Sequence, residues 1–245
     1  LAGNVKKAFN KKFYNPETRS YGDFGSNIFA LVLGVPDDRY DDVVATLKHE
    51  ISVKYDNHLN TGIFGTQFFF ETLALNGLND IAYNAMNQED FPSFGNWIKQ
   101  GATVTWEKWN GADSRNHPMF GGGLTWFYRI LAGVNVDAER PAYEHIIIKP
   151  ILDKRLPEVY YSHMTPYGEV VSEIRQTGRN LEMNVTVPVG STATIYIPVG
   201  GNTSEVTESG ISVRDSKDVR FERIQDGNCI VRVPQGKYKF KVDNQ

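Results

Sequence analysis

The stretch GATVTWEKWNGADSRNH, residues 101–117, is the most informative part of the sequence. Glu107 lies between Trp106 and Trp109, which are two of only four tryptophans in the chain. Sugar sites use this combination, because aromatic rings cover the apolar faces of a pyranose and a carboxylate accepts a proton from a hydroxyl or from water. His117 follows beyond a polar loop and could fold back over the same pocket. Alternatively, both indoles are core anchors and Glu107 is a solvated or helix-capping acid.

Outward from this stretch, residues 1–133 have the hydrophobic spacing of helices. The pattern predicts helices over residues 1–14, 26–34, 37–55, 66–76, 78–86 and 124–131. In the clearest of them, 37–55, acids at the start and lysines toward the end match the helix dipole. The first has no capping residue, which suggests that the helix begins elsewhere. Paired helices along a chain suggest a toroid of helical hairpins.

After Gly133 the spacing changes from helical to alternating. HIIIK, residues 145–149, predicts a strand covered on both faces, and alternating apolar residues predict strands over 181–187, 193–197 and 238–242. Pro188 and Pro198 are expected to close two strands. Turn signals occur at TPYG (165–168), Thr177-Gly178, Val189-Gly190, Gly200-Gly201 and Asp226-Gly227. This half is predicted to be an antiparallel β-sandwich of about eight strands, beginning near residues 133–142.

The bulk composition excludes several classes of protein. The chain has 245 residues, which is enough for one large or two ordinary domains. Its content of 40% hydrophobic and 22% charged residues is that of a globular protein. A net charge of −3 without a basic cluster argues against nucleic-acid binding, and no apolar run approaches the roughly 20 residues that span a membrane. The single cysteine, Cys229, excludes an intramolecular disulfide. The five histidines are scattered, so neither a metal nor another cofactor is expected.

Four segments match a known family in the family's own order. They are HLNTGIFGTQFFFETLALNGLNDIAYNAMNQEDFPSFGNWIKQGATVTWEKWNG (58–111), NHPMFGGGLTWFYRILAG (116–133), YEHIIIKP (143–150) and TPYG (165–168). Together they closely resemble the C-terminal part of bacterial α-L-rhamnosidases of glycoside hydrolase family 78. In that family an (α/α)6 barrel carries catalysis and a C-terminal β-sandwich packs against it. The resemblance implies a multidomain α and β chain: residues 1–137 would be the C-terminal half of the barrel and 138–245 the β-sandwich.

The resemblance also implies roles for particular residues. The glutamate of the family's Trp-Glu motif falls on Glu107, which would be the general base of an inverting hydrolysis of terminal α-L-rhamnosyl residues. Trp106 and Trp109 would wall the pocket, and His117 would hydrogen-bond a rhamnose hydroxyl. His58 would either contact the sugar or only order its loop. The expected partners are glycosides or polysaccharides that contain L-rhamnose.

One catalytic group is not found in the chain. An inverting glycosidase needs a second carboxyl group as general acid, roughly 6.5–9.5 Å from the base, and in the family it comes from segments further upstream. Asp23 and Glu71 are the best local substitutes, but Asp23 suits a turn and Glu71 lies within a predicted helix. We therefore expect a fragment that is inactive alone. Its exposed helix faces would pack against the missing N-terminal half of the barrel or in a homodimer.

Other interpretations remain open. The chain could be a non-catalytic carbohydrate-binding or structural fragment, for which Tyr160, Tyr161 and Tyr167 are the clustered aromatic candidates, or it could be another (α/α)6 glycosidase. Trp97 could line a cleft, although packing is favoured. The glycines at 121–123 could form an anion site or allow close helix packing. For the cellular location, a periplasmic or secreted protein is favoured over a cytoplasmic one.

Overall fold

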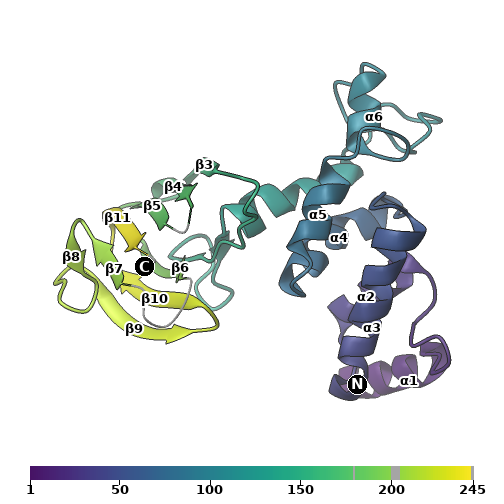
Figure 1. Cartoon of the computed structure of the whole chain (residues 1–245), viewed down its shortest axis with the longest axis horizontal. Helices are drawn as coiled ribbons and strands as arrows, with labels where there is room; N and C mark the ends of the chain where they lie inside the picture. Colours follow the sequence, from purple (N-terminus) through teal and green to yellow (C-terminus); the bar gives the residue numbers. More distant parts are fainter. Residues whose placement is uncertain (179, 200–204, 244–245) are drawn as a thin grey trace. The chain divides into compact units, whose positions relative to one another are not determined.

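The computed structural model describes residues 1–178, 180–199 and 205–243, and it forms two compact units, Leu1–Trp126 and Phe127–Gln245. The first unit is helical and the second consists mainly of strands (Figure 1). The predicted fold class, helical hairpins followed by antiparallel sheets, is confirmed. Among the described residues, none of the helices combines the length and the apolarity needed to traverse a lipid bilayer.

The helical unit contains six α-helices and irregular helical turns in its described residues. They are α1 (Ala2–Phe13), α2 (Phe24–Leu33), α3 (Asp37–His49), the π-helix η1 (Glu50–Lys54), α4 (Ile63–Leu75), α5 (Asn79–Met86), α6 (Phe94–Lys99) and the 3₁₀-helix η2 (Pro118–Leu124). The π-helix η3 (Trp126–Leu131) follows. Asp23, which is expected from the sequence to serve a turn, instead caps α2 by accepting a hydrogen bond from the Ser26 N–H.

Two helix predictions need correction. The expected helix over 37–55 changes to a π-helix at Glu50, where the Tyr55 N–H bonds to the Glu50 carbonyl. The expected helix over 124–131 is instead a 3₁₀ turn followed by a π-helix. The spacing of apolar residues predicts which face is buried. It does not distinguish hydrogen bonds to the third, fourth or fifth residue along the chain.

The core of the helical unit is aromatic. Helix α2 packs against α3 and α4, and α4 packs against α5. Phe24 and Phe69, both fully buried, stack with ring centroids 5.4 Å apart, and Phe70 packs at 6.0 Å from Trp126. Burying aromatic side chains of this size supplies much of the stability of a small helical unit.

Glycines in η2 let it approach α4 closely. A Cβ atom at Gly122 would lie 2.9 Å from the Cβ of Gln67, and one at Gly123 would lie 3.0 Å from the Phe70 ring. Such distances leave no room for a side chain. Gly122 and Gly123 therefore serve close packing in this structure, one of the two roles expected from the sequence for the glycines at 121–123.

The second unit contains two sheets. The five-stranded sheet has the order β1 (Val134–Val136), β2 (His145–Ile148), β6 (Thr192–Pro198), β10 (Asn228–Val233), β9 (Arg220–Gln225). The six-stranded sheet has the order β3 (Glu158–Thr165), β4 (Gly168–Thr177), β5 (Asn180–Val187), β11 (Gly236–Asp243), β7 (Glu205–Glu208), β8 (Ile211–Ser212). Strand β2 pairs with β6 in parallel, and the other described pairings are antiparallel.

The alternating pattern correctly predicts the buried face of the long strands. In β5 and β11 every second residue is buried, and these apolar residues join Cys229 and the inner residues of the other sheet in one core. Strands β5 and β6 end beside Pro188 and at Pro198, as expected. The number of strands was underestimated, because β1, β7 and β8 are too short to show alternation. The predicted turn at Gly200-Gly201 lies outside the described residues.

Two phenylalanines on α4 provide a test of the helical core. Phe69 is fully buried and Phe64 is 66% exposed. Replacing Phe69 by Ala leaves a cavity, so we expect a loss of about 3–5 kcal/mol in the free energy of unfolding. The matched variant Phe64→Ala should change it by less than about 0.5 kcal/mol. All four tryptophans lie in this unit, so urea unfolding followed by tryptophan fluorescence measures both. Equal losses in the two variants would contradict this packing.

Candidate active site

The loop between Thr105 and His117 is closed by main-chain pairing. The His117 N–H donates to the Thr105 carbonyl at 2.8 Å, and the Thr105 hydroxyl donates to the His117 carbonyl at 2.7 Å. Further in, the Glu107 N–H donates to the Ser114 carbonyl at 2.8 Å. These bonds hold the two sides of the loop together, so Glu107 and His117 lie close although ten positions separate them in the sequence.

One oxygen of the Glu107 carboxylate has defined partners. Its Oε2 accepts a hydrogen bond from the Ser114 N–H at 3.1 Å and lies 3.9 Å from Nδ1 of His117. The Glu107 side chain is 35% exposed and that of His117 is 27% exposed. Nε2 of His117 is buried and has no hydrogen-bond partner among the residues that the structure describes. The arrangement combines an anchored carboxylate that water can reach with an unused imidazole nitrogen.

The tryptophans beside this loop form a cluster. Trp109 stacks on Trp97 with centroids 4.5 Å apart and meets Phe120 edge to face at 4.5 Å. The indole N–H of Trp97 donates to the Trp109 carbonyl, and the indole N–H of Trp109 donates to the Thr61 carbonyl, each at 2.8 Å. Trp97 is only 2% exposed, so it packs in the cluster rather than lining a cleft.

Trp106 is held by the loop itself. The side chain is 4% exposed, and the Arg115 guanidinium lies 4.7 Å from the centroid of its ring. The Arg115 Nε in turn donates a hydrogen bond to the Gly111 carbonyl. Gly111 has a φ of +74° and its backbone contacts the same ring. The sequence pattern did not single out Ser114 or Arg115, and only the polar run before His117 drew attention to this part of the loop.

His58 has two partners in its own surroundings. Its Nε2 lies 2.8 Å from Asp90, and its Nδ1 lies 3.0 Å from the Tyr55 carbonyl. Burial lowers the pKa of His58, but the hydrogen bond and charge of the Asp90 carboxylate, together with main-chain hydrogen bonds to Tyr55 and Asp56, outweigh it, so the pKa of His58 is raised. The hydrogen bond between the two side chains lowers the pKa of Asp90. Among the described residues, these contacts tie His58 to a neighbouring loop and not to Glu107 or His117.

Within the described ranges, no group of three or more His, Cys, Asp or Glu side chains is arranged to hold a metal ion. In the 101–117 loop the carboxylate of Glu107 and the imidazole of His117 lie close together, with Oε2 and Nδ1 3.9 Å apart. Both are suited to moving protons and to hydrogen-bonding hydroxyl groups.

Comparison with known proteins identifies the family. The model of the bacterial alpha-L-rhamnosidase 6 hairpin glycosidase domain matches residues 1–131, and that of the bacterial alpha-L-rhamnosidase C-terminal domain matches residues 133–212. The chain belongs to the bacterial α-L-rhamnosidase family. The resemblance inferred from the sequence motifs is thereby confirmed.

Individual α-L-rhamnosidases agree with this assignment. One from Formosa agariphila is 27% identical over 248 residues, which is 96% of this chain and 26% of that protein. The structure of the enzyme from Dictyoglumus thermophilum is 33% identical with a TM-score of 0.87, covering 99% of this chain and 28% of that one. The Streptomyces avermitilis enzyme in complex with L-rhamnose, at 24% identity and a TM-score of 0.85, shares the fold over 98% of this chain and 24% of its own. The chain thus spans about a quarter of the length of these rhamnosidases.

The contact between Gly111 and Trp106 can be tested with two alanine variants. Gly111 and Gly101 both have positive φ, so alanine strains the backbone at either position by about 1–3 kcal/mol. Only at Gly111 would the new Cβ atom meet the Trp106 ring, at 2.7 Å, whereas no atom lies within 4 Å at Gly101. We expect Gly111→Ala to shift the Trp106 indole and Glu107 amide resonances in ¹H–¹⁵N spectra. Gly101→Ala should leave them in place, and comparable shifts in both variants would argue against this contact.

The His58–Asp90 pair predicts a defined pH dependence. Because the folded-state pKa of His58 is raised, the pair contributes stability that is fully present below the ordinary histidine pKa near 6.5 and is lost as pH rises through the raised value. Asp90→Asn should lower the His58 pKa, since the charge of the carboxylate and its charge-assisted hydrogen bond are then lost. NMR titration of the imidazole measures the change. Glu89→Gln is the control, because Glu89 pairs with Lys99, and it should leave the His58 titration unchanged.

Proposed function

We propose that this chain acts as part of an α-L-rhamnosidase that removes terminal α-L-rhamnosyl residues from glycosides or polysaccharides by an inverting hydrolysis. The main support is the arrangement at Glu107, an anchored, partly exposed carboxylate beside His117, in a chain of the rhamnosidase family. The name α-L-rhamnosidase of its relatives, and the L-rhamnose in the Streptomyces avermitilis structure, support the substrate class.

In this proposal Glu107 is the general base. Its Oε2 is held by the Ser114 N–H, while Oε1 has no hydrogen bond to another described residue and is left for a water molecule. The water oxygen forms a bond to the anomeric carbon from the side opposite the leaving group, and its proton passes to Glu107. The bond from the anomeric carbon to the leaving oxygen breaks as a general acid protonates that oxygen. The anchored oxygen keeps the carboxylate in one orientation during the transfer.

His117 would bind the sugar. Leaving a buried nitrogen such as its Nε2 unpaired costs about 1–3 kcal/mol, and a sugar hydroxyl would remove that cost. Trp106 and Trp109 would form the apolar side of the pocket. Trp109 is the more accessible of the two, whereas Trp106 would contact a ligand on a full face only if Arg115 moved. For His58 we propose a loop-ordering role, because both its nitrogens already have partners.

The general acid would come from helices outside this chain. Large apolar side chains on the helical unit support the idea that further helices pack there: Leu33, Val53, Phe64, Leu75 and Ile98 are between 63% and 71% exposed. Exposed apolar surface on a helical unit is expected where another element covers it. We propose that the remaining half of an (α/α)6 barrel covers them, and a second copy of the chain is the alternative occupant.

The alternative of a carbohydrate-binding module carried by the clustered tyrosines receives little support. Tyr160 is 62% exposed, but Tyr161 stacks on Tyr128 and Tyr167 lies against Gly190. A saccharide platform needs aromatic faces exposed side by side, and these rings are engaged in different contacts.

The test is hydrolysis of an aryl α-L-rhamnoside. We expect the 245-residue chain to be inactive and the longer protein that contains it to be active. In the longer protein, Glu107→Gln should lower kcat by about 10²–10⁴-fold, as expected for loss of a general base. The matched control is Asp113→Asn, a carboxylate of the same loop that pairs with Lys108, and it should keep near-parental activity. A Glu107→Gln protein as active as its parent would refute the assigned role, and parental rates in the 245-residue chain would refute the need for further helices.

A further inference from the structure

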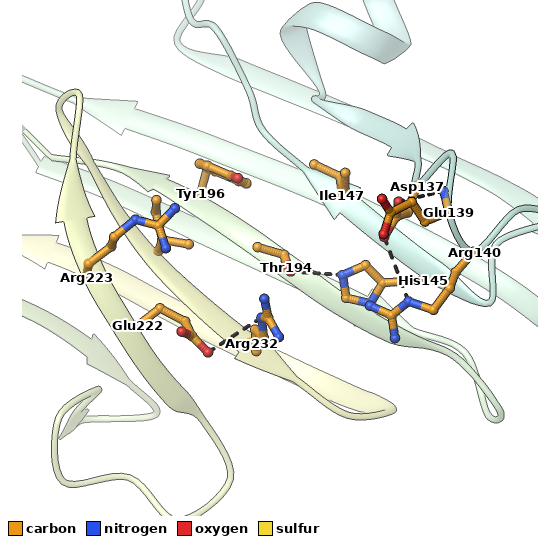
Figure 2. Close-up of a pocket in the computed structure, with 11 residues that line it drawn as sticks. Asp137, Glu139, Arg140, His145, Ile147, Thr194, Tyr196, Glu222, Arg223 and Arg232 are labelled. Atoms are coloured by element: carbon orange, nitrogen blue, oxygen red, sulfur yellow. Dashed lines mark hydrogen bonds and ion pairs between the residues drawn. The ribbon is translucent and has the colours of Figure 1, made fainter.

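The second unit has a pocket on the face of its five-stranded sheet that points away from the core. Ile146, Ile195 and Val231 point into the core, and the residues that alternate with them on β2, β6 and β10 line the pocket. Its volume is about 230 Å³. The lining consists of Asp137, Glu139, Arg140, His145, Ile147, Thr194, Tyr196, Glu222, Arg223, Ile230 and Arg232 (Figure 2). No part of the function proposed above uses these residues.

The floor of the pocket is fixed. His145 is 4% exposed, and its two ring nitrogens lie 2.7 Å and 2.9 Å from the hydroxyl oxygens of Thr192 and Thr194. Burial, together with the positive charges of Arg140 and Arg232, lowers the pKa of His145, so the ring stays neutral around neutral pH. The floor is therefore an uncharged, hydrogen-bonded surface, and the charged groups stand around it.

Three arginines and three carboxylates line the pocket around this floor, and they are unevenly paired. Glu222 is shared by Arg232 at 3.5 Å and Arg220 at 3.1 Å, and Asp137 lies 3.8 Å from Arg140. No carboxylate among the described residues pairs with Arg223, whose Nε donates to the Gln225 side chain. Figure 2 shows Arg223, Glu222 and Arg232 along one side and Arg140 beside His145 at the other end. Arg223 is therefore the lining arginine left for a carboxylate that a ligand supplies, and Lys149, 5.1 Å from the Tyr196 ring centroid, adds a cation beside that ring.

The pocket also offers what a sugar requires. Tyr196 supplies a partly exposed ring at its edge. Oε1 of Glu222 is buried against Arg220 and Arg232, whereas Oε2 has no hydrogen bond to another described residue and is left for a hydroxyl group. Carboxylates accept hydrogen bonds from hydroxyl groups, whereas they repel a simple anion. Guanidinium groups bind carboxylates through paired hydrogen bonds. A ligand that uses both kinds of group carries a carboxylate and several hydroxyls.

We propose that this pocket binds an acidic saccharide. The carboxylate of a uronate binds Arg223, the sugar ring lies against Tyr196, and its hydroxyls donate to Glu222. The site is non-catalytic and does not involve Glu107. Saccharide binding here can therefore be tested independently of the proposed hydrolysis.

The experiment is a titration of the ¹⁵N-labelled 245-residue chain with trigalacturonate, followed by amide shifts. We expect saturable shifts at Tyr196, Arg223 and Arg232. Fully methyl-esterified trigalacturonate, which has the same rings without the charges, should bind at least about 10-fold more weakly, because charge-assisted hydrogen bonds are lost. Inorganic phosphate at the same concentration should produce no saturable shifts.

Two variants locate the site. Arg223→Gln should weaken binding of trigalacturonate about 10-fold or more, with an otherwise unchanged amide spectrum. Arg175→Gln is the matched control: Arg175 is an exposed strand arginine of the other sheet, paired with Glu158 and Glu173, and its loss should not alter binding. The proposal is overturned by equal affinity for the methyl ester, by phosphate binding as tight as that of the uronate, by binding that survives Arg223→Gln, or by no saturable binding at all.

Discussion

Two indole N–H groups, those of Trp97 and Trp109, must find hydrogen-bond partners inside an aromatic cluster. Trp97 donates to the Trp109 carbonyl, and Trp109 donates to the Thr61 carbonyl just before α4. A buried N–H without a partner costs about 1–3 kcal/mol, so the two bonds fix how each ring is turned. They also join α6, the 101–117 loop and the start of α4. Because Glu107 lies two residues before Trp109, these bonds help to fix where its backbone lies, and the Ser114 N–H then orients its carboxylate.

The fold could be predicted from the sequence wherever one face of an element is buried. Alternation in β5 and β11 and the spacing in α2 to α5 report burial directly, since burial selects the residue types. Which strands pair with each other could not be predicted in this way. The parallel alignment of His145 with Thr192 joins residues 47 positions apart, and no local pattern encodes it. The short strands β7 and β8 likewise exist because a neighbouring strand offers hydrogen bonds, not because their sequences alternate.

The candidate site could be predicted in part for the same reason. Glu107 and His117 are near in sequence and carry recognisable chemistry, so their proximity was a reasonable expectation. The partners that hold them were not predictable. The Ser114 N–H is a main-chain group available in any sequence, and the Asp90 that pairs with His58 is 32 residues away. The burial of Trp106 depends on the cover provided by Arg115 and on the left-handed backbone at Gly111. These contacts between Trp106, Arg115 and Gly111 can be seen only once the loop is folded.

The lone cysteine gives the chain an unusual chemical simplicity. Cys229 is buried in the β-sandwich core, and burial raises the pKa of its thiol to about 11. Thiolates, not thiols, form disulfides and react with electrophiles. The Cys229 thiol is therefore unreactive at neutral pH. As a result, the folded chain should form and lose no disulfide at neutral pH, whether its surroundings are oxidising or reducing. A cysteine introduced on the surface would be the single reactive thiol, so one probe could be attached at one chosen position without first removing the native residue.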